Sequence, residues 1–407
     1  MPAAKAGTPL SEARTRVAEL VGASYGRLLA LLAARSGDIA AAEDAIADAL
    51  ERALTRWPAD GIPANPEGWV LTVARNRLRD HWKSHAYRMT DPLPEIVCDA
   101  TELDVDAIPD RRLELMLVCA HPAIAACRTP LMLQTVLGVD AAAIAEAFAV
   151  PAATMAQRLV RAKRRIRDAR IPFVLPGRAD LDERLPAVLE AVYGAYAIDW
   201  PAAGAGIESL CAEALHLALV LAELLPDEPE ALGLAALVCL SESRRAARRT
   251  GGGVLVPLDE QDPAMWDSTL IARGEALLDR AHGLGRPGRY QYEAAIQSAH
   301  CSRPVDWSAL RRLHRALLRV APSLGGAVAL AAVDAEIDGP DAGLRTLDAI
   351  TDPAVQRFQP AWTTRGHLLA RAGRQVAAAE AYRRAIDLTS EPAVAEYLRA
   401  QLAALPQ

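Results

Sequence analysis

The stretch PAATMAQRLVRAKRRIRDAR, residues 151–170, decides how this chain is interpreted. It holds seven cations from position 158 onward and a single acid, Asp168, in a protein of net charge −6. At about 100° per residue, a helix here has an apolar stripe of Met155, Leu159, Ala162 and Ile166 beside a polar stripe. The polar stripe consists of Thr154, Gln157, Arg158, Arg161 and Arg165. One face suits a core and the other suits a polyanion, which is the division that a DNA recognition helix needs.

The residues just before this stretch predict a helix-turn-helix. Asp140 is placed to cap a short helix over Ala141–Ala149, with Ile144 and Phe148 expected to point inward. Val150 and Pro151 form the turn, because proline is tolerated at the first position of a helix. In this motif the start of the second helix enters the major groove. The predicted base-reading residues are Ala152, Ala153, Thr154 and Gln157. The predicted phosphate contacts are Arg158, Arg161, Lys163, Arg164 and Arg165.

A second basic helix is predicted in GWVLTVARNRLRDHWKSH, residues 68–85, after a loop rich in proline and glycine at 58–66. Its apolar stripe is Leu71, Ala74, Leu78 and Trp82, and its polar stripe is Thr72, Arg75, Asn76, Arg79 and Lys83. A cationic helix with an amide in its centre is suited to a separated DNA strand and an extruded base. Trp69 and Trp82 have two interpretations, core packing or base stacking, and core packing is favoured.

Composition indicates an all-α protein of several domains. The chain has 407 residues, 52% hydrophobic and 4% aromatic, with long runs of alanine and leucine. Residues 1–180 carry 23 Lys and Arg against 22 Asp and Glu, whereas residues 181–407 carry 22 against 29. Residues 86–110 lose helical periodicity and turn acidic, which predicts a tether between two small domains. The acidic second half is expected to have a partner other than nucleic acid.

The end of the chain predicts a tetratricopeptide-like (TPR-like) α-solenoid. Residues at positions 4, 8, 15, 20, 24 and 27 of such a unit are Trp362, Gly366, Gly373, Ala378, Tyr382 and Ala385. Gly339 precedes Gly373 by the 34-residue period of this repeat. An ordinary helical bundle is the alternative. The glycine-rich segment 250–257 is the predicted interruption of the array that begins near Leu181.

No motif predicts an enzyme, a cofactor or a metal site. The sequence lacks a Walker lysine, an HExxH zinc motif and a nucleophile elbow. Cys119, His121 and Cys127 form a partial metal set, but the standard spacing and a fourth ligand are missing. The six cysteines, Cys98, Cys119, Cys127, Cys211, Cys239 and Cys301, are therefore expected to be free thiols in a reducing cytoplasm. The N-terminus lacks a signal core, and no membrane span is expected.

Three segments resemble bacterial extracytoplasmic-function (ECF) RNA polymerase sigma factors. They are residues 41–58, AAEDAIADALERALTRWP; 65–83, NPEGWVLTVARNRLRDHWK; and 150–173, VPAATMAQRLVRAKRRIRDARIPF. Residues 224–240, 285–300 and the terminal repeat resemble the subgroup with a C-terminal helical extension. The resemblance implies sigma region 2 at 1–88, an acidic linker at 89–110, region 4 at 111–173 and a TPR-like extension at 181–407.

The resemblance also implies roles for residues. The helix 38–57 matches the surface that docks on core polymerase, with candidate contacts Glu43, Asp44, Asp48 and Arg52. Asn76 matches the pocket for an unpaired base of the −10 element, and Arg75, Arg79 and Lys83 match backbone contacts there. Region 4 reads the −35 element. The chain departs from the family at Ala47 and Leu50, where glutamine and phenylalanine are common, and in AVYGAYAIDW at 191–200, where the extension starts.

The expected function is therefore that of a sigma factor, a non-enzymatic subunit that binds core RNA polymerase and promoter DNA. The helical extension is expected to regulate the factor or bind a protein partner. Two other classes stay open: a TPR scaffold protein, and a stand-alone helix-turn-helix regulator without a polymerase partner.

Overall fold

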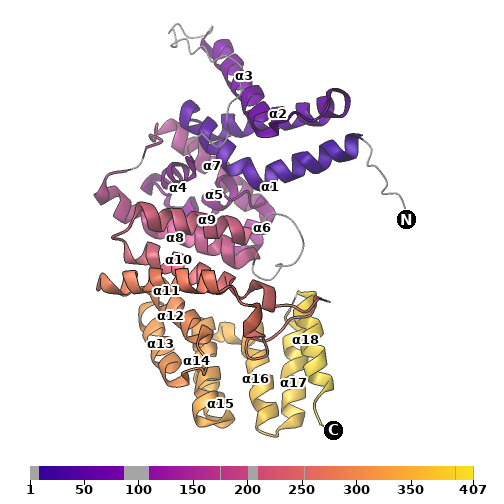
Figure 1. Ribbon diagram of the computed structural model, residues 1–407, viewed down its shortest axis with the longest axis vertical. Helices are drawn as coiled ribbons and strands as arrows, with labels where there is room; N and C mark the ends of the chain where they lie inside the picture. The colour runs from indigo at the N-terminus through magenta and orange to yellow at the C-terminus, as the bar shows by residue number, and fades with distance from the viewer. Residues whose placement is uncertain are drawn as a thin grey trace. The chain divides into compact units, whose positions relative to one another are not determined.

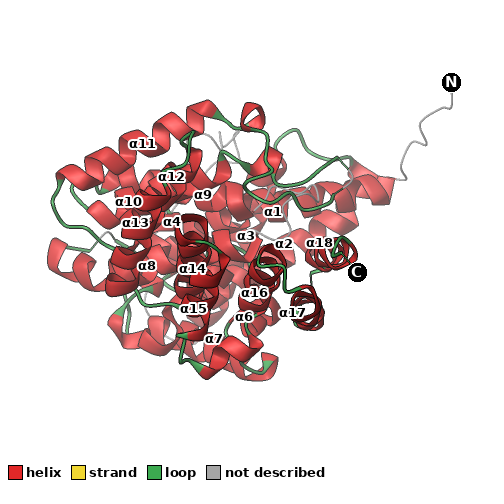
Figure 2. Cartoon of the chain, turned by 90° about the horizontal axis from the view of Figure 1, so that it is seen from below, coloured by secondary structure: helices red, strands yellow, loops and turns green. Residues whose placement is uncertain are grey.

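The computed structural model describes residues 9–86, 110–174, 176–199, 210–251, 253–389 and 391–406. Within these ranges it contains eighteen α-helices, a few short 3₁₀ turns and no β-strand (Figure 2). The all-α class predicted from composition is confirmed. Contacts divide the chain into two compact units, residues 1–200 with 205–214 and residues 201–204 with 215–407. Each unit is described by itself.

The first unit begins with α1 (Pro9–Ser36), α2 (Ile39–Asp60) and α3 (Pro66–Ala86), drawn in indigo and violet in Figure 1. The predicted cap of α2 is confirmed, because the Asp38 carboxylate accepts hydrogen bonds from the Ala40 and Ala41 N–H groups at 3.0 and 3.2 Å. The Ser24 hydroxyl of α1 donates to the Glu67 carboxylate of α3. Helices α1, α2 and α3 all contact one another and form one packed group.

Helix α1 is also long and apolar enough to cross a membrane by length and composition alone. Half of that apolar window is buried inside the protein, and its buried residues include Leu28, Leu29 and Leu32. A core helix of a soluble fold has the same properties. The predicted acidic linker at 89–110 lies almost entirely outside the described residues.

The rest of the first unit is a cluster of shorter helices. These are α4 (Arg112–Cys119), α5 (Arg128–Thr135), α6 (Ala141–Ala147), α7 (Ala152–Asp168) and α8 (Arg178–Asp199), with a 3₁₀ segment at Pro122–Cys127. Helix α8 packs on α4 and α5, where the Arg184 guanidinium donates to the Leu117 carbonyl at 3.3 Å. The first turn of α9 (Leu210–Leu224) also belongs to this unit, and the Glu213 carboxylate there pairs with Arg112. The compact unit thus continues beyond residue 181, where the sequence places the start of the extension.

The second unit is built around α10 (Pro229–Glu242), which is buried along its whole length. It packs against α11 (Ser268–Gly283) and α12 (Arg289–Cys301), and α12 packs against α13 (Trp307–Val320). The glycine-rich segment falls in the irregular stretch between α10 and α11, where Arg249 and Leu255 form a β-bridge. The predicted interruption of the helical array is therefore where the sequence places it.

The last helices form successive pairs. They are α14 (Leu324–Asp338) with α15 (Pro340–Asp348), α16 (Gln359–Arg371) with α17 (Gln375–Asp387), and then α18 (Pro392–Ala403). Gly339 and Gly373 stand at the same place in the two pairs, between first and second helix, with φ of 87° and 75°. This left-handed conformation favours glycine. Arg374 pairs with Asp341 at 2.6 Å and Arg371 pairs with Glu336, so two arginines of the second pair of helices contact the pair before it.

The packing within α16 and α17 explains another residue of the repeat pattern. A Cβ atom added to Gly366 would lie 2.8 Å from the ring of Tyr382, so the two helices approach closely at this point. Ala378, Tyr382 and Ala385 are buried along the facing side of α17. The residues that the repeat pattern singles out are therefore the ones that bring the two helices together.

Candidate nucleic-acid interface

Helices α6 and α7 are joined by a tight turn. The Asp140 carboxylate accepts from the Ala142 N–H at 2.7 Å, which confirms the predicted cap of α6. Helix α6 ends at Ala147, and Ala149 adopts a positive φ of 51°. The Val150 N–H then donates to the Ala145 carbonyl at 2.9 Å, which closes the turn before α7 begins at Ala152.

One prediction for α6 is wrong. Ile144 is buried as expected, but Phe148 is 43% exposed. The i, i+4 pattern assumes that the helix continues through residue 148. Because α6 ends at Ala147, Phe148 is the C-cap of the helix, and its side chain is left exposed at the turn.

The two faces of α7 are the ones that the periodicity predicts. Met155, Leu159, Ala162 and Ile166 are buried. Thr154 is half-buried, and the other predicted base readers, Ala152, Ala153 and Gln157, are exposed. Of the predicted phosphate contacts, the exposed ones are Arg158, Arg161, Arg164 and Arg165. We call these four residues the arginine face. Within the described ranges none of them forms an ion pair, so a polyanion would meet no competing carboxylate on them.

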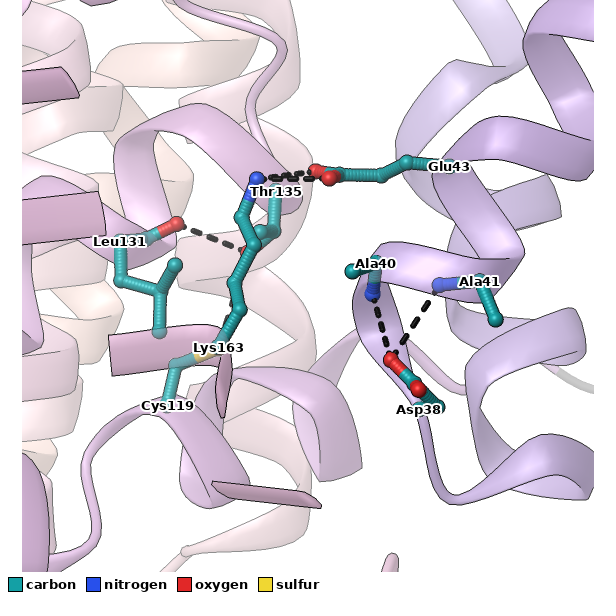
Figure 3. A network of polar contacts seen from close by, with 8 residues as sticks. All are labelled: Asp38, Ala40, Ala41, Glu43, Cys119, Leu131, Thr135 and Lys163. Carbon is teal, nitrogen blue, oxygen red and sulfur yellow. Dashed lines mark hydrogen bonds and ion pairs between the residues drawn. The ribbon is translucent and has the colours of Figure 1, made fainter. Parts of the chain in front are cut away.

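Lys163 does not belong to the arginine face. Its side chain is 9% exposed, and its Nζ lies 2.7 and 2.6 Å from Oε1 and Oε2 of Glu43 on α2 (Figure 3). Lys163 follows Leu159 by four residues, which places it about 40° around the helix, at the edge of the buried stripe. The sequence predicts that Lys163 contacts a DNA phosphate and that Glu43 contacts the polymerase. In the structure these two residues instead contact each other.

The ion pair is mostly buried, with side-chain exposures of 9% for Lys163 and 20% for Glu43. Burial raises the pKa of Glu43, Lys163 opposes that rise, and the carboxylates of Asp44 and Asp38 add to it. Beside the lysine stem, the Thr135 hydroxyl donates to the Leu131 carbonyl at 2.8 Å, and Cys119 Sγ lies 3.6 Å from Thr135 Oγ1 (Figure 3). Burial raises the pKa of the Cys119 thiol to about 12.

The partial Cys and His set is used in local structure. Besides the contact of Cys119 with Thr135, His121 Nδ1 accepts a hydrogen bond from the Ala123 N–H at 3.1 Å and so caps the 3₁₀ segment. Among the described residues, no group of three His, Cys, Asp or Glu side chains is placed to hold a metal ion.

The residues of α3 that are predicted to bind a DNA strand differ in their exposure to solvent. Asn76 and Arg79 are exposed, and Arg79 Nη2 donates to Asn76 Oδ1 at 3.0 Å. Thr72 and Arg75 are half-buried, and the side chain of Lys83 lies outside the described ones. An amide whose carbonyl oxygen is held by an arginine still offers its N–H₂ donors to a base edge.

The aromatic residues beside α3 favour the core interpretation. The Trp57 and Trp69 ring centroids lie 5.5 Å apart at an interplanar angle of 66°, and Trp57 is buried. This edge-to-face pair fixes the start of α3 against the end of α2. Trp82 is half-buried.

The predicted polymerase-contacting residues on α2 fall into two groups. Asp44 and Arg52 are exposed. Glu43 and Asp48 are half-buried and paired, Glu43 with Lys163 and Asp48 with Arg77 at 2.5 Å. Of these four predicted contacts, Asp44 and Arg52 are therefore the ones directly available to a partner.

Comparisons with known proteins agree with this architecture in part. Residues 20–88 match the sigma-70 region 2 family, and residues 184–282 match a family of unknown function, DUF6596. The uncharacterized protein R00370 of Rhizobium meliloti (strain 1021) is 36% identical over 383 residues, which cover 89% of this chain and 89% of that protein. No solved structure matches the chain.

Helices α1 to α3 therefore contain a sigma-70 region 2 domain, the kind of domain that supports binding of core RNA polymerase and promoter DNA. Proteins with this domain are transcription initiation factors rather than enzymes. The chain as a whole belongs to the same family as the Rhizobium meliloti protein. Neither domain family covers residues 89–183, which include α6 and α7.

Proposed function

We propose that this protein is a sigma factor of the ECF type that directs core RNA polymerase to specific promoters. The observation that carries the proposal is the sigma-70 region 2 match at residues 20–88, followed in the same chain by the arginine face of α7. This function requires no catalytic group or cofactor, and it places the protein in the cytoplasm, where RNA polymerase acts.

The proposal assigns a different promoter element to each of the two basic helices. Helix α7 takes the −35 duplex, with Gln157 among the bases and the arginine face along the phosphates. Helix α3 takes the opened −10 strand, with Asn76 at an unpaired base and Arg75, Arg79 and Lys83 along its backbone. On α2, the exposed Asp44 and Arg52 take the polymerase, together with Glu43 and Asp48 once these are released from their partners.

The second unit is proposed to be a TPR-like solenoid that regulates the factor or receives a protein partner. Its support is the pair of helical hairpins with glycine turns at Gly339 and Gly373 and the close approach of Gly366 to Tyr382. Deletion of residues 215–407 tests this role, and unchanged promoter output in vivo and in vitro would contradict it. The deletion begins at residue 215 because the first unit includes α8 and continues through residue 214.

Pull-down of bacterial core polymerase, followed by run-off transcription with the purified pair, tests the main proposal. We expect binding and initiation at a defined start. Asp44→Ala and Arg52→Ala are expected to weaken binding, whereas Glu51→Ala, an exposed acid on the same helix outside the predicted contacts, serves as the matched control. A protein that binds duplex DNA but does not bind core polymerase would favour a stand-alone regulator. A protein that binds neither DNA nor polymerase would favour a TPR scaffold.

A further inference from the structure

The irregular stretch between α10 and α11 contains an apolar run that ends in two acids. Residues 254–258, VLVPL, are five consecutive apolar residues, and each of them is half-buried although none belongs to a helix. Asp259 and Glu260 follow directly and are exposed. We call residues 254–261 the crossing segment. Partial burial of every apolar side chain in a loop indicates that the segment lies against other parts of the second unit.

The crossing segment is fixed near the end of α10 on both sides. At its start, the Val256 N–H donates to the Arg248 carbonyl at 2.8 Å. Beyond its end, the Asp267 N–H donates to the Ser243 carbonyl at 2.8 Å, just before α11 begins. Between these two anchors the chain extends away from α10 toward the terminal hairpins (Figure 1). The segment is therefore a loop that is held at its base and reaches a distant part of the same unit with its tip.

The tip of the crossing segment lies beside α16 and α18 (Figure 1). There the Glu260 N–H donates to the Pro257 carbonyl at 3.0 Å, so a turn presents Asp259 and Glu260 together. Helix α16 is the first helix of its hairpin, and α18 follows that hairpin in the place of the next first helix. The tip thus reaches a surface built by successive hairpins, and repeat proteins use such surfaces for binding.

Groups that can bind a carboxylate lie near the two acids of the tip. Burial lowers the pKa of His367 on α16, the Arg371 guanidinium lowers it further, and the Asp259 carboxylate acts in the opposite direction. Burial raises the pKa of Tyr397 on α18, and the carboxylates of Glu260 and Asp259 add to that rise. Such effects weaken with distance, so the carboxylates lie near both rings. We call His367, Arg371 and Tyr397 the acceptor surface, because each side chain can donate a hydrogen bond to a carboxylate.

We propose that the acceptor surface is a binding site for an extended acidic segment of a partner protein, and that the crossing segment occupies this site while the partner is absent. The partner's segment is expected to combine apolar residues with two neighbouring carboxylates, because the crossing segment docks with these features. Binding of the partner displaces the tip from α16 and α18. This inference rests on the role proposed for the second unit and deepens it, since it names the surface that receives the partner.

The contact of the tip suits exchange with a partner. Asp259 and Glu260 are exposed, and exposed charges add little stability, so the tip is released at small cost. The anchors near α10 nevertheless keep the tip at an effective concentration of about 1 mM beside the acceptor surface. If the tethered tip and a free peptide share a Kd of about 10 µM, this competition weakens the apparent affinity of the peptide about hundredfold.

A labelled peptide of the crossing segment itself is the probe. We titrate GVLVPLDEQD, residues 253–262, with the full-length protein and measure fluorescence anisotropy. The opened variant combines Asp259→Lys with Glu260→Lys, so that the cationic acceptor surface repels its tip. We expect it to bind the probe about hundredfold more tightly than wild type does. The control variant combines Glu380→Lys with Asp387→Lys, which makes the same charge change at exposed positions of α17, and it should behave as wild type.

A second probe tests the recognition of carboxylates. It carries asparagine and glutamine in place of Asp259 and Glu260 and is otherwise the same peptide. We expect the opened variant to bind it about tenfold more weakly than the acidic probe, because hydrogen bonds to a charged acceptor are the stronger ones. Thermal unfolding of the three proteins verifies that both sets of substitutions leave the fold intact.

Several results would overturn the inference. Equal affinity of wild type and the opened variant for the acidic probe does so, whether both bind it or neither does. An equal gain in the control variant identifies a general charge effect, and equal binding of the two probes removes the role of the carboxylates. None of these measurements involves polymerase or DNA. A failed peptide test therefore leaves the sigma-factor proposal intact, and a failed polymerase pull-down leaves the peptide result unchanged.

Discussion

Arg161 and Lys163 lie two residues apart on one basic helix, carry the same charge and are predicted from sequence to play the same role. The structure separates them, because Arg161 is exposed without an ion pair and Lys163 is buried against Glu43. Substitution of each by an uncharged residue therefore gives a sharp test of the site. We expect Arg161→Ala to remove a phosphate contact and Lys163→Met to remove none.

The magnitude follows from counterion release. Each phosphate neutralised contributes about −0.9 to the slope of log K against log salt concentration, so four contacts from the arginine face give a slope of about −3.6. Arg161→Ala should reduce this to about −2.7 and weaken binding to every −35 sequence alike. Lys163→Met should leave the slope near −3.6, since its ammonium group does not reach the DNA.

Fluorescence anisotropy of a labelled −35 duplex with the full-length protein, titrated between 50 and 200 mM salt, measures both slopes. Over this fourfold range one contact changes affinity by about 3.5-fold, which such titrations resolve. A fall of about 0.9 in the slope of Lys163→Met, or no fall for Arg161→Ala, would refute the assignment of the two cations.

Other parts of the molecule give further predictions. Gln157→Ala should change which −35 base is preferred, by about 1–3 kcal/mol at one position in competition binding, and equal losses on all sequences would show that Gln157 does not read a base. Gly366→Ala should destabilise the second unit by about 1–3 kcal/mol in thermal unfolding because its Cβ meets the Tyr382 ring, whereas the open position Gly325→Ala should not. Burial lowers the pKa of His300 to about 4, with Arg244 adding to the effect, so its contribution to stability is present above pH 6.5 and is lost as pH falls toward 4. Urea unfolding should show a loss of about 3 kcal/mol between pH 7 and pH 4 that His300→Gln reduces, and the same pH profile in both proteins would contradict this.

Local patterns were sufficient to predict much of the fold and part of the site. The caps of α2 and α6 depend only on an aspartate before an alanine-rich run, and both are confirmed. The apolar stripe of α7 follows from helical periodicity, which is a property of the sequence itself. The glycine turns at Gly339 and Gly373 follow from a repeated spacing.

The missed features depend on partners far away in the sequence or on where a helix stops. Lys163 pairs with a residue 120 positions earlier, and no local pattern distinguishes it from Arg161 or Arg164. From the sequence alone, Gly26 is only a residue that disfavours a helix. The structure shows that its backbone lies against Val136, where a side chain would not fit. Phe148 is predicted to point inward because the i, i+4 pattern assumes a helix that continues through it, whereas α6 ends at Ala147 and leaves the side chain exposed. A cation at the edge of an apolar stripe, four residues after Leu159, is the one signal that could have identified Lys163.

The glycine turns at Gly339 and Gly373 and the ion pairs that reach back one hairpin have an evolutionary consequence. Removal of residues 340–373 would join Gly339 directly to Arg374, recreating the same glycine–arginine junction between a first and a second helix. Duplication of that segment would join Gly373 to a second copy of Pro340, which repeats the junction of Gly339 with Pro340. A whole hairpin could thus be gained or lost, and the length of the helical array changed, without redesign of any junction.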